Sequence, residues 1–357
     1  MDKKKHSKLY MLTKSGFYEN LRSLLGNTWA MFYLLIGGRE AGKSYAVMKF
    51  FLKTYRKNGN PFYWLRLNEN ATRKLLINNA KDLIDADLRR LYNLNDLVVR
   101  GECVYEVTKR DKNGKIREKR LLCRVMALST YYGNKGQALF DKDWLDNNPE
   151  WWYNIAFDEF NRERGEKRCF DIVNALANQL ENLIRTTKKH VRILCIANTL
   201  EEGSDLLEAF NFVPETFGRF KLKKKKCIIE NIPITEAYKQ RRDGSAADIL
   251  VGKDNSSFSN EVALDKSRVW KGKLTKPQYV IVFDKYMMFT VWEGNIIAPY
   301  NNEKVRRVAM RPALDLPYSV DALNAVVMNY NARTFWFKNL LTAIQFKKEM
   351  RAFLPKK

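Results

Sequence analysis

Histidine is almost absent from this chain of 357 residues, which contains only His6 and His190. Its five cysteines are odd in number and widely spaced, and no two of them form a CxxC pair. A Ser-His-Asp triad or a structural zinc site is therefore close to excluded. Scattered cysteines also argue against a disulfide framework and are typical of a reducing compartment.

Long apolar runs are missing as well. No segment approaches 18 uncharged apolar residues, which is about the length that a membrane-spanning helix needs. The first residues, MDKKKHSKLYMLTKSG, are basic but lack the apolar core and cleavage site of a signal peptide. We therefore expect a soluble intracellular protein that does not span a membrane.

Positive charge is what the chain has in excess. It contains 64 Lys and Arg against 40 Asp and Glu, so the net charge is +24 and the pI about 9.7. Such an excess destabilises a compact chain by self-repulsion unless a polyanion is nearby. Nucleic acid is the first expected partner and an anionic membrane surface the second, while a basic surface without a partner stays open.

Strand and helix patterns alternate along the first two thirds of the sequence. The apolar runs WAMFYLLI (29–36), PFYWLRL (61–67), WWYNIAF (151–157) and RILCIAN (192–198) are typical of buried strands. Helices are predicted at 44–55, 71–92 and 169–187. Alternating residues on both sides of an Asn-Gly near 113 predict a β-hairpin with a basic tip. This order predicts an α/β fold with a mostly parallel sheet flanked by helices.

The length and the last third of the chain indicate a second domain. Residues 236–262 are polar and contain Gly and Ser, which is typical of a linker. Beyond them, residues 278–300 alternate like paired strands and residues 321–354 have the pattern of a helix. We predict one domain over residues 1–235 and a small α+β domain over residues 263–357.

A glycine-framed octet links the first predicted strand to the helix that follows it. It consists of Gly37, Gly38, Arg39, Glu40, Ala41, Gly42, Lys43 and Ser44 and fits the Walker A pattern GxxxxGK[ST]. Glycines let the backbone N–H groups surround a phosphate at the helix N-terminus. Lys43 should reach the β- and γ-phosphates and the Ser44 hydroxyl should bind Mg²⁺. The alternative is a glycine-rich turn that binds nothing.

Two successive acids end the apolar strand at 151–157. Asp158 would hold Mg²⁺ through its waters, in the Walker B role, and Glu159 would orient or deprotonate the attacking water. This pair favours a hydrolase over a small-molecule kinase. By itself, an acidic pair at a strand end is equally compatible with no catalytic role.

Two further polar residues follow the site in sequence. Asn198 ends a strand expected between those of the octet and the acidic pair, and could sense the γ-phosphate; otherwise it caps the next segment. Arg185 ends the helix after the acids, from where it could reach a neighbouring subunit as an arginine finger. Alternatively it only complements the negative end of its helix.

GGREAGKSYA, NIAFDEF, the helix ending in LIR, and RILCIANT resemble the packaging ATPases of phi29-like podophages. The likeness spans about residues 17 to 235. It implies a P-loop ATPase of the additional-strand, catalytic-glutamate class that uses ATP and Mg²⁺ as a terminase-like ring motor. The implied partners are double-stranded DNA, the phage portal or procapsid, prohead RNA and identical subunits in a ring, a pentamer by resemblance, in the host cytoplasm.

Residue roles carry over from this resemblance one position at a time. It assigns phosphate and Mg²⁺ to Lys43 and Ser44, the metal to Asp158 and catalysis to Glu159. Arg185 matches the finger that acts in trans. Arg39 matches an arginine that large terminases carry inside the loop, and FYEN at 17–20 implies that Phe17 or Tyr18 stacks on adenine.

The tail resembles an RNase H-like nuclease that has lost its acids. Only Asp284, Asp315 and Asp321 remain as candidates, whereas a two-metal nuclease needs several converging acids. We expect a vestigial domain that binds nucleic acid, with prohead RNA as the family's example. The basic candidates for this contact are Lys266, Arg268, Lys271, Lys273, Arg306 and Arg307.

Two basic segments of the first domain are candidates for DNA contact. The first is the hairpin tip, with Lys109, Arg110, Lys112, Lys115, Arg117, Lys119 and Arg120, and the second is the run Lys223, Lys224, Lys225 and Lys226. For both, the alternative is a solvated charged face. Taken together, the sequence predicts an ATP-driven DNA translocase that packages a viral genome. The alternatives are a nucleic-acid-binding protein with a silent P-loop, or another P-loop NTPase such as a helicase, a kinase or a GTPase.

Overall fold

The structure is a computed structural model of the whole chain. It describes residues 16–133, 138–139, 147–148, 150–161, 170–185, 187, 190–198, 204–233, 235–251, 269, 279–283, 287–292, 295–298, 330–331, 335–337, 340–341 and 343–344. The chain divides into two compact units. The first comprises residues 1–200 and 216–262, and the second residues 201–215 and 263–357.

A nine-stranded sheet forms the centre of the first unit, with the order β3-β4-β5-β2-β6-β7-β1-β9-β8. Its strands are β1 (Phe32–Ile36), β2 (Phe62–Arg66), β3 (Leu97–Arg100), β4 (Cys103–Arg110), β5 (Ile116–Ala127), β6 (Tyr153–Asp158), β7 (Val191–Ala197), β8 (Gly218–Leu222) and β9 (Cys227–Asn231). The six strands from β5 to β9 in this order are parallel to one another. The pairs β3–β4, β4–β5 and β8–β9 are antiparallel. The predicted α/β fold with a mostly parallel sheet is confirmed.

Strand β7 lies between β1 and β6, as the sequence analysis expects. Ile36 pairs with Ala197, and Asp158 pairs with Ile196. The carboxyl ends of β1, β6 and β7 therefore meet at one edge of the sheet, which we call the carboxyl edge. The opposite edge, where these strands begin, is the amino edge. In open α/β sheets ligands bind outside the carboxyl ends.

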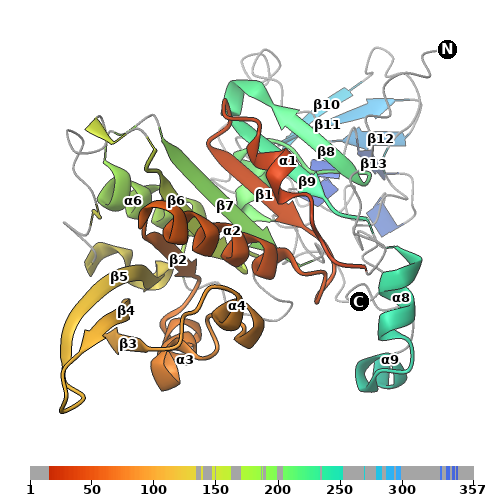
Figure 1. The fold of residues 1–357 in the computed structure, drawn as a ribbon. Coiled ribbons are helices and arrows are strands. Elements are labelled where there is room, and N and C mark those ends of the chain that lie inside the picture. The colour runs from red at the N-terminus through yellow and green to blue at the C-terminus, as the bar shows by residue number, and fades with distance from the viewer. Residues whose placement is uncertain are drawn as a thin grey trace. The chain divides into compact units, whose positions relative to one another are not determined.

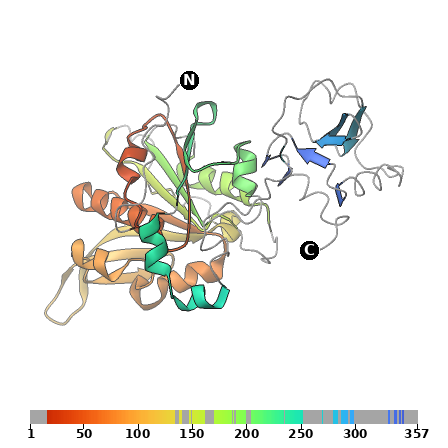
Figure 2. The same ribbon diagram turned by 90° about the vertical axis from the view of Figure 1, so that its right-hand side faces the viewer.

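The described residues of the first unit also form several helices. They are α1 (Leu21–Leu25), α2 (Lys43–Asn58), α3 (Glu69–Ala80), α4 (Ala86–Leu91), α6 (Ile172–Ile184), α8 (Glu236–Arg242) and α9 (Ala246–Val251), with the 3₁₀ turns η1 (Leu128–Gly133) and η2 (Lys223–Lys225). Figures 1 and 2 show α2 along one face of the sheet. Right-handed crossovers place α2 and α6 on opposite faces, because β1 to β2 and β6 to β7 advance in opposite directions. Among the residues that the structure describes, no helix is both long and apolar enough to span a bilayer.

The core explains why the predicted helix after β1 forms where it does. Val47, Phe51 and Tyr55 recur every four residues along α2 and are fully buried, so one stripe of the helix faces the sheet. The Phe51 ring packs on the Phe62 ring of β2 at 5.0 Å between centroids. Packing of this kind fixes the start of α2, and with it the octet, at the carboxyl edge.

The structure differs from the sequence-based expectations at three places. Residues 71–92 form two helices, α3 and α4, because the backbone leaves the helical region at Ile77 and turns left-handed at Asn78 and Asn79. The hairpin β8–β9 was not predicted, since its lysines interrupt the apolar pattern. Residues 236–251, expected within a linker, include helices α8 and α9.

In the second unit, the described residues form helix α7 (Asp205–Ala209) and a four-stranded sheet, β10 (Tyr279–Phe283), β11 (Met287–Trp292), β12 (Asn295–Ala298) and β13 (Phe335–Phe337). The antiparallel pairs β10–β11 and β11–β12 confirm the expectation of paired strands. Residues 335–337, expected to be helical, instead form β13 and pair with β12, which the aromatic run Phe-Trp-Phe favours.

Several candidate residues of the tail lie outside the described residues. They are Asp284, Asp315 and Asp321 of the vestigial nuclease, and the basic candidates Lys266, Arg268, Lys271, Lys273, Arg306 and Arg307.

Candidate nucleotide-binding site

The octet connects β1 to α2 at the carboxyl edge, in the strand–loop–helix setting that a P-loop needs. Gly42 caps α2 in the left-handed region, with φ at 80° and ψ at 15°. A side chain on Gly38 would place its Cβ 2.6 Å from the Tyr238 hydroxyl of α8. Both glycines are therefore required by the backbone, Gly42 for its conformation and Gly38 for the close approach of α8.

The Lys43 side chain is held by hydrogen bonds to the loop that precedes it. Its amine donates hydrogen bonds to the carbonyls of Gly37 at 3.0 Å and Gly38 at 2.7 Å. Burial lowers the pKa of the Lys43 amine to about 8, and the nearby Asp158 carboxylate opposes this shift. At neutral pH the buried amine is therefore still mainly a cation, placed where a phosphate would lie against the loop.

Asp158 and Glu159 end β6 beside the loop. The Ser44 hydroxyl donates a hydrogen bond to Asp158 Oδ1 at 2.9 Å. Arg66, at the end of β2, donates to Asp158 Oδ2 at 3.2 Å with one nitrogen and to the Glu159 carboxylate with another. Burial raises the pKa of the Asp158 carboxyl, while the Arg66 guanidinium acts in the opposite direction. The Glu159 side chain is 53% exposed, so its carboxylate can meet water.

The oxygen atoms of Ser44 and Asp158 fit a divalent cation of the Mg²⁺ type. They already share one hydrogen bond, so both face the same point next to the loop. Within the described residues, no cluster of three His, Cys, Asp or Glu side chains is close enough to hold a metal. A site with two protein oxygens suits Mg²⁺, which keeps several waters and takes its remaining ligands from substrate phosphates.

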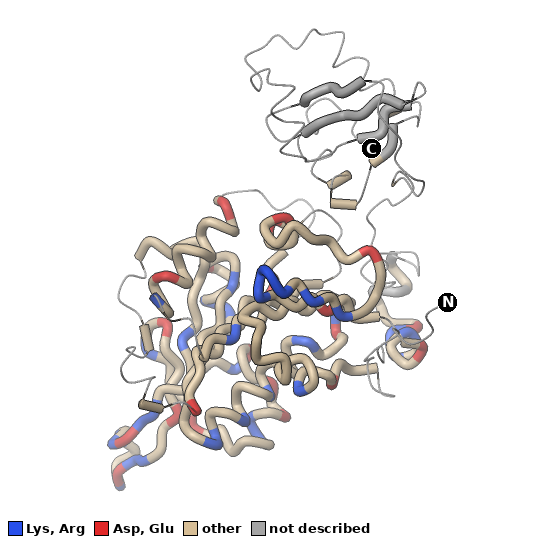
Figure 3. The backbone as a smooth tube through the Cα atoms, turned by 90° about the horizontal axis from the view of Figure 1, so that it is seen from above, with Lys and Arg blue, Asp and Glu red and all other residues tan. Residues whose placement is uncertain are grey.

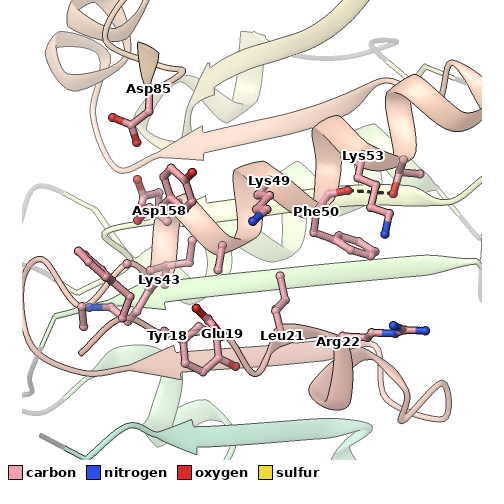
Figure 4. Close-up of a pocket in the computed structure, with 18 of the residues that line it drawn as sticks. Tyr18, Glu19, Leu21, Arg22, Lys43, Lys49, Phe50, Lys53, Asp85 and Asp158 are labelled. Carbon is pink, nitrogen blue, oxygen red and sulfur yellow. Dashed lines mark hydrogen bonds between the residues drawn. The ribbon is translucent and has the colours of Figure 1, made fainter. Parts of the chain in front are cut away.

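A pocket of about 1420 Å³ contains these residues and continues along α2. Figure 4 shows Lys43 and Asp158 at one end, and Lys49, Lys53 and Arg22 along the other. Small-molecule pockets usually measure roughly 300–1,000 Å³, so a nucleotide at the loop would leave the far end open. Asn198, predicted as a phosphate sensor, lines the pocket at the end of β7.

The predicted adenine contacts lie in different surroundings. Tyr18 lines the pocket but is only 3% exposed, and its hydroxyl donates to the buried Glu230 of β9 at 2.8 Å. Phe17 is 44% exposed, and the Arg241 guanidinium lies 3.9 Å from its ring centroid. The exposed ring of Phe17 is therefore the better placed of the two to stack on a base.

Arg185 lies outside this pocket. It is exposed, ends α6 with φ at 48°, and its backbone N–H donates to the Glu181 carbonyl at 3.0 Å. Val191, where β7 begins at the amino edge, follows six positions later. The structure thus does not bring Arg185 to the site of its own chain.

The two basic segments both lie toward the amino edge. Cys227 pairs with Phe32, the first residue of β1, so the run Lys223–Lys226 precedes that edge. Cys123 pairs with Phe62, and β5 begins seven positions earlier at Ile116. At about 3.3 Å per residue, β5 begins roughly 23 Å before the point where β2 starts to pair with it.

Arg66 and helix α8 are parts of the site that the sequence alone does not predict. Arg66 is one of many arginines in the sequence, and only the pairing of β2 with β6 brings it to Asp158 and Glu159. The sequence of helix α8, EAYKQRR, gives little apolar signal, because Ala237 and Tyr238 are its only apolar residues. The capping Thr235, whose hydroxyl accepts from the Tyr238 N–H, was an available signal for a helix start.

The fold and the loop define a P-loop NTPase of the α/β class. The chain belongs to the podovirus DNA encapsidation protein (Gp16) family, whose model matches residues 12–296. It is similar to the DNA packaging protein of Bacillus phage phi29, with 25% identity over 285 residues, 79% of this chain and 76% of the relative. With the DNA packaging protein of Bacillus phage B103 it shares 27% identity over 267 residues, 72% of this chain and 73% of the relative.

Two solved structures have a similar fold. One is the bacteriophage Phi-29 viral genome packaging motor assembly, with a TM-score of 0.59 and 21% identity over 94% of this chain and 99% of that one. The other is the Phi-28 gp11 DNA packaging motor, with a TM-score of 0.55 and 15% identity over 96% of this chain and 99% of that one. At these identities the likeness establishes the fold.

Proposed function

We propose that this protein is an ATP-driven translocase of double-stranded DNA that packages a viral genome into a procapsid. The observation that carries the proposal is the convergence of Lys43, Ser44, Asp158 and Glu159 in one pocket at the carboxyl edge. Membership of the DNA encapsidation family supports the same conclusion. The net charge of +24 provides the attraction that a DNA partner needs.

Each residue of the pocket has a separate proposed role in hydrolysis. The loop and Lys43 bind the triphosphate, and Ser44 and Asp158 would hold Mg²⁺, which neutralises phosphate charge when bound. Glu159, exposed and at the mouth of the pocket, orients a water and accepts its proton. Arg66 fixes the carboxylates of Asp158 and Glu159 relative to each other, because it binds both. Asn198 is the proposed contact to the γ-phosphate.

A complete site needs a second copy of the chain. Arg185 is exposed and remote from its own pocket, so we assign it to the pocket of a neighbour, where its charge would stabilise the transferring phosphoryl group. The active form is then a homo-oligomeric ring, a pentamer by resemblance to the phi29-like motors. It would work on the portal of the procapsid in the host cytoplasm, with prohead RNA as a further partner of that resemblance.

Two substitutions test the assignment of the pocket. Lys43→Ala should weaken binding of MgATP itself, because the loop loses its buried cation. Glu159→Gln should bind MgATP normally and lose roughly 10²–10⁴-fold in turnover, because the cradle remains and the base is gone. Equilibrium binding of a fluorescent ATP analogue and phosphate release measure the two effects. Normal turnover by Glu159→Gln would refute the assignment, and absence of binding by the native chain would favour a silent P-loop.

A further inference from the structure

Helix α8 binds the phosphate-binding loop through side chains that do not line the pocket. The carbonyl of Arg39 accepts hydrogen bonds from the Tyr238 hydroxyl at 2.5 Å and from Arg242 Nη1 at 3.2 Å. The next carbonyl, that of Glu40, accepts one from Arg241 Nη2 at 2.9 Å. Two consecutive peptide groups of the loop are therefore bound by one short helix.

The position of α8 against the loop is set by glycines. The Tyr238 side chain is 1% exposed, and only the absence of a side chain at Gly38 leaves room for its hydroxyl. At the start of the helix, a Cβ on Gly16 would lie 2.9 Å from the Tyr238 backbone nitrogen. Close packing on both glycines leaves α8 little freedom to shift.

A third carbonyl is bound in the same way. The carbonyl of Ala41 accepts a hydrogen bond from the backbone N–H of Tyr18 at 2.8 Å. Glu40 adopts a positive φ of 59°, a backbone conformation that is unfavourable for a residue with a side chain. The hydrogen bonds to the neighbouring carbonyls offset this cost and keep the loop in a conformation that it would otherwise leave.

Because the peptide bond is planar, hydrogen bonds to the loop carbonyls also fix the direction of the N–H groups that follow them. In a trans peptide the C=O of one residue and the N–H of the next point in opposite directions. Because the described residues include no cis peptide bond, fixing the carbonyls of residues 39 to 41 on these partners directs the N–H groups of residues 40 to 42 away from the same partners. Successive N–H groups on one side form a nest for an anion.

We propose that Tyr238, Arg241 and Arg242 are positioning residues for nucleotide binding, which hold the loop in its phosphate-binding geometry before the nucleotide arrives. The inference rests on the proposed function and extends it to three residues that do not line the pocket. Preorganised donors bind charge without the cost of reordering the backbone. The expected ligand is the triphosphate of a nucleotide, and the expected effect lies in its affinity.

The test uses Tyr238→Phe and Arg241→Gln in the full chain. Tyr238→Phe keeps the ring and removes only the hydroxyl, and Arg241 is exposed, so both variants should fold. Lys239→Gln is the matched control, because it removes one cation from the same helix, and the Lys239 amine pairs with Glu236 of α8 and not with the loop carbonyls of the described residues. Circular dichroism and thermal unfolding check the fold of each variant.

Each test variant should raise the Kd of a fluorescent MgATP analogue, and the KM for MgATP, about 3- to 10-fold, the usual effect of losing one hydrogen bond. The kcat should change less than twofold, because Glu159 and Asp158 are not on this loop. Lys239→Gln should match the native chain.

Unchanged Kd and KM in both variants would overturn the inference, as would a fall in kcat at unchanged Kd. Lower thermal stability with native Kd would also overturn it, since the contacts would then be merely structural. Failure of the proposed function is a separate result, in which the native chain itself binds no MgATP.

Discussion

Charged side chains are treated differently at the two edges of the central sheet. At the carboxyl edge, Lys43 and Asp158 are buried. Hydrogen bonds to the loop carbonyls position Lys43, and a hydrogen bond from Ser44 positions Asp158. At the amino edge, the cations of two hairpins project into solvent. Buried and positioned charge is what chemistry at a phosphate requires, whereas exposed charge suits a polyanion bound at any sequence.

The two hairpins of the amino edge also differ from each other. In the β4–β5 hairpin, Lys109 pairs with Glu118 at 3.5 Å, Arg110 with Asp96 at 2.8 Å and Arg117 with Asp111 at 3.0 Å. Lys119 and Arg120 lie over the rings of Tyr105 and Tyr55. Much of the positive charge of this hairpin is therefore neutralised or engaged within the chain.

The β8–β9 turn has no such neutralisation. Among the described residues, no acid forms an ion pair with Lys223, Lys224, Lys225 or Lys226. Figure 3 shows this turn as a continuous blue segment, whereas red and blue alternate at the hairpin tip. The Lys226 carbonyl accepts from the N–H groups of Met31 and Phe32 at 2.8 and 3.0 Å, so the turn is fixed to β1. Of the two predicted DNA contacts, we expect this rigid turn to dominate.

The largest effect should come from Arg185, an amino-edge residue that we assign to the carboxyl edge of a neighbouring subunit. Arg185→Ala should lower turnover roughly 10³-fold or more, as loss of an arginine finger does. Mixing Arg185→Ala with Glu159→Gln subunits should restore part of the activity, because some interfaces then combine an intact Glu159 with an intact Arg185. Phosphate release across mixing ratios measures this. Lack of recovery at every ratio, with rings confirmed by native mass spectrometry, would place Arg185 in cis or give it only a structural role.

The next effect concerns the lysine turn. Log affinity for DNA falls with log salt in proportion to the phosphates contacted, with a slope near −0.9 per phosphate. Replacing Lys223–Lys226 by glutamate should lower the magnitude of this slope by about three to four. Fluorescence anisotropy with duplexes of two unrelated sequences measures it, and both duplexes should respond alike. An unchanged slope would move the DNA contact elsewhere on the chain.

The smallest effect should come from the hairpin tip. Lys112 and Lys115 have no ion-pair partner among the described residues, so reversing these two should lower the slope by about two at most. Reversing the charges of the paired Lys109, Arg110 and Arg117 should change the salt slope less per charge. Each of these cations must break its ion pair with an acid before it can contact a phosphate. The same anisotropy titrations decide the point. A larger decrease of the salt slope from the paired set than from the lysine turn would show that the β4–β5 hairpin, and not the β8–β9 turn, makes the main DNA contact.

The parts of the site that sequence could predict are those whose signal is contiguous. The octet, the strand that ends in Asp158 and Glu159, and the place of β7 beside β1 follow from local patterns and a right-handed crossover rule. Arg66 and α8 could not be predicted, because their role depends on contacts between residues far apart in the chain. Arg66 meets Asp158 across 92 positions, and Tyr238 meets Arg39 across 199.

Hairpin β8–β9 and strand β13 show a second limit of sequence patterns. Cys227 to Asn231 is fully buried in β9, although Glu230 and Asn231 within it are polar, because Tyr18, Asn20 and Arg219 all bond Glu230. Strand β13 is three residues long and flanked by helical periodicity. In both cases tertiary pairing, and not local preference, decides the structure.

We propose that ATP turnover at the carboxyl edge is coupled to DNA held at the amino edge. Steady-state phosphate release by the native chain, measured at low salt with and without double-stranded DNA, tests it most directly. We predict that DNA stimulates release, that unrelated sequences stimulate equally, and that raising the salt removes the stimulation as the DNA dissociates. Turnover that is identical with and without DNA, in a protein shown to bind that DNA, would contradict the claim.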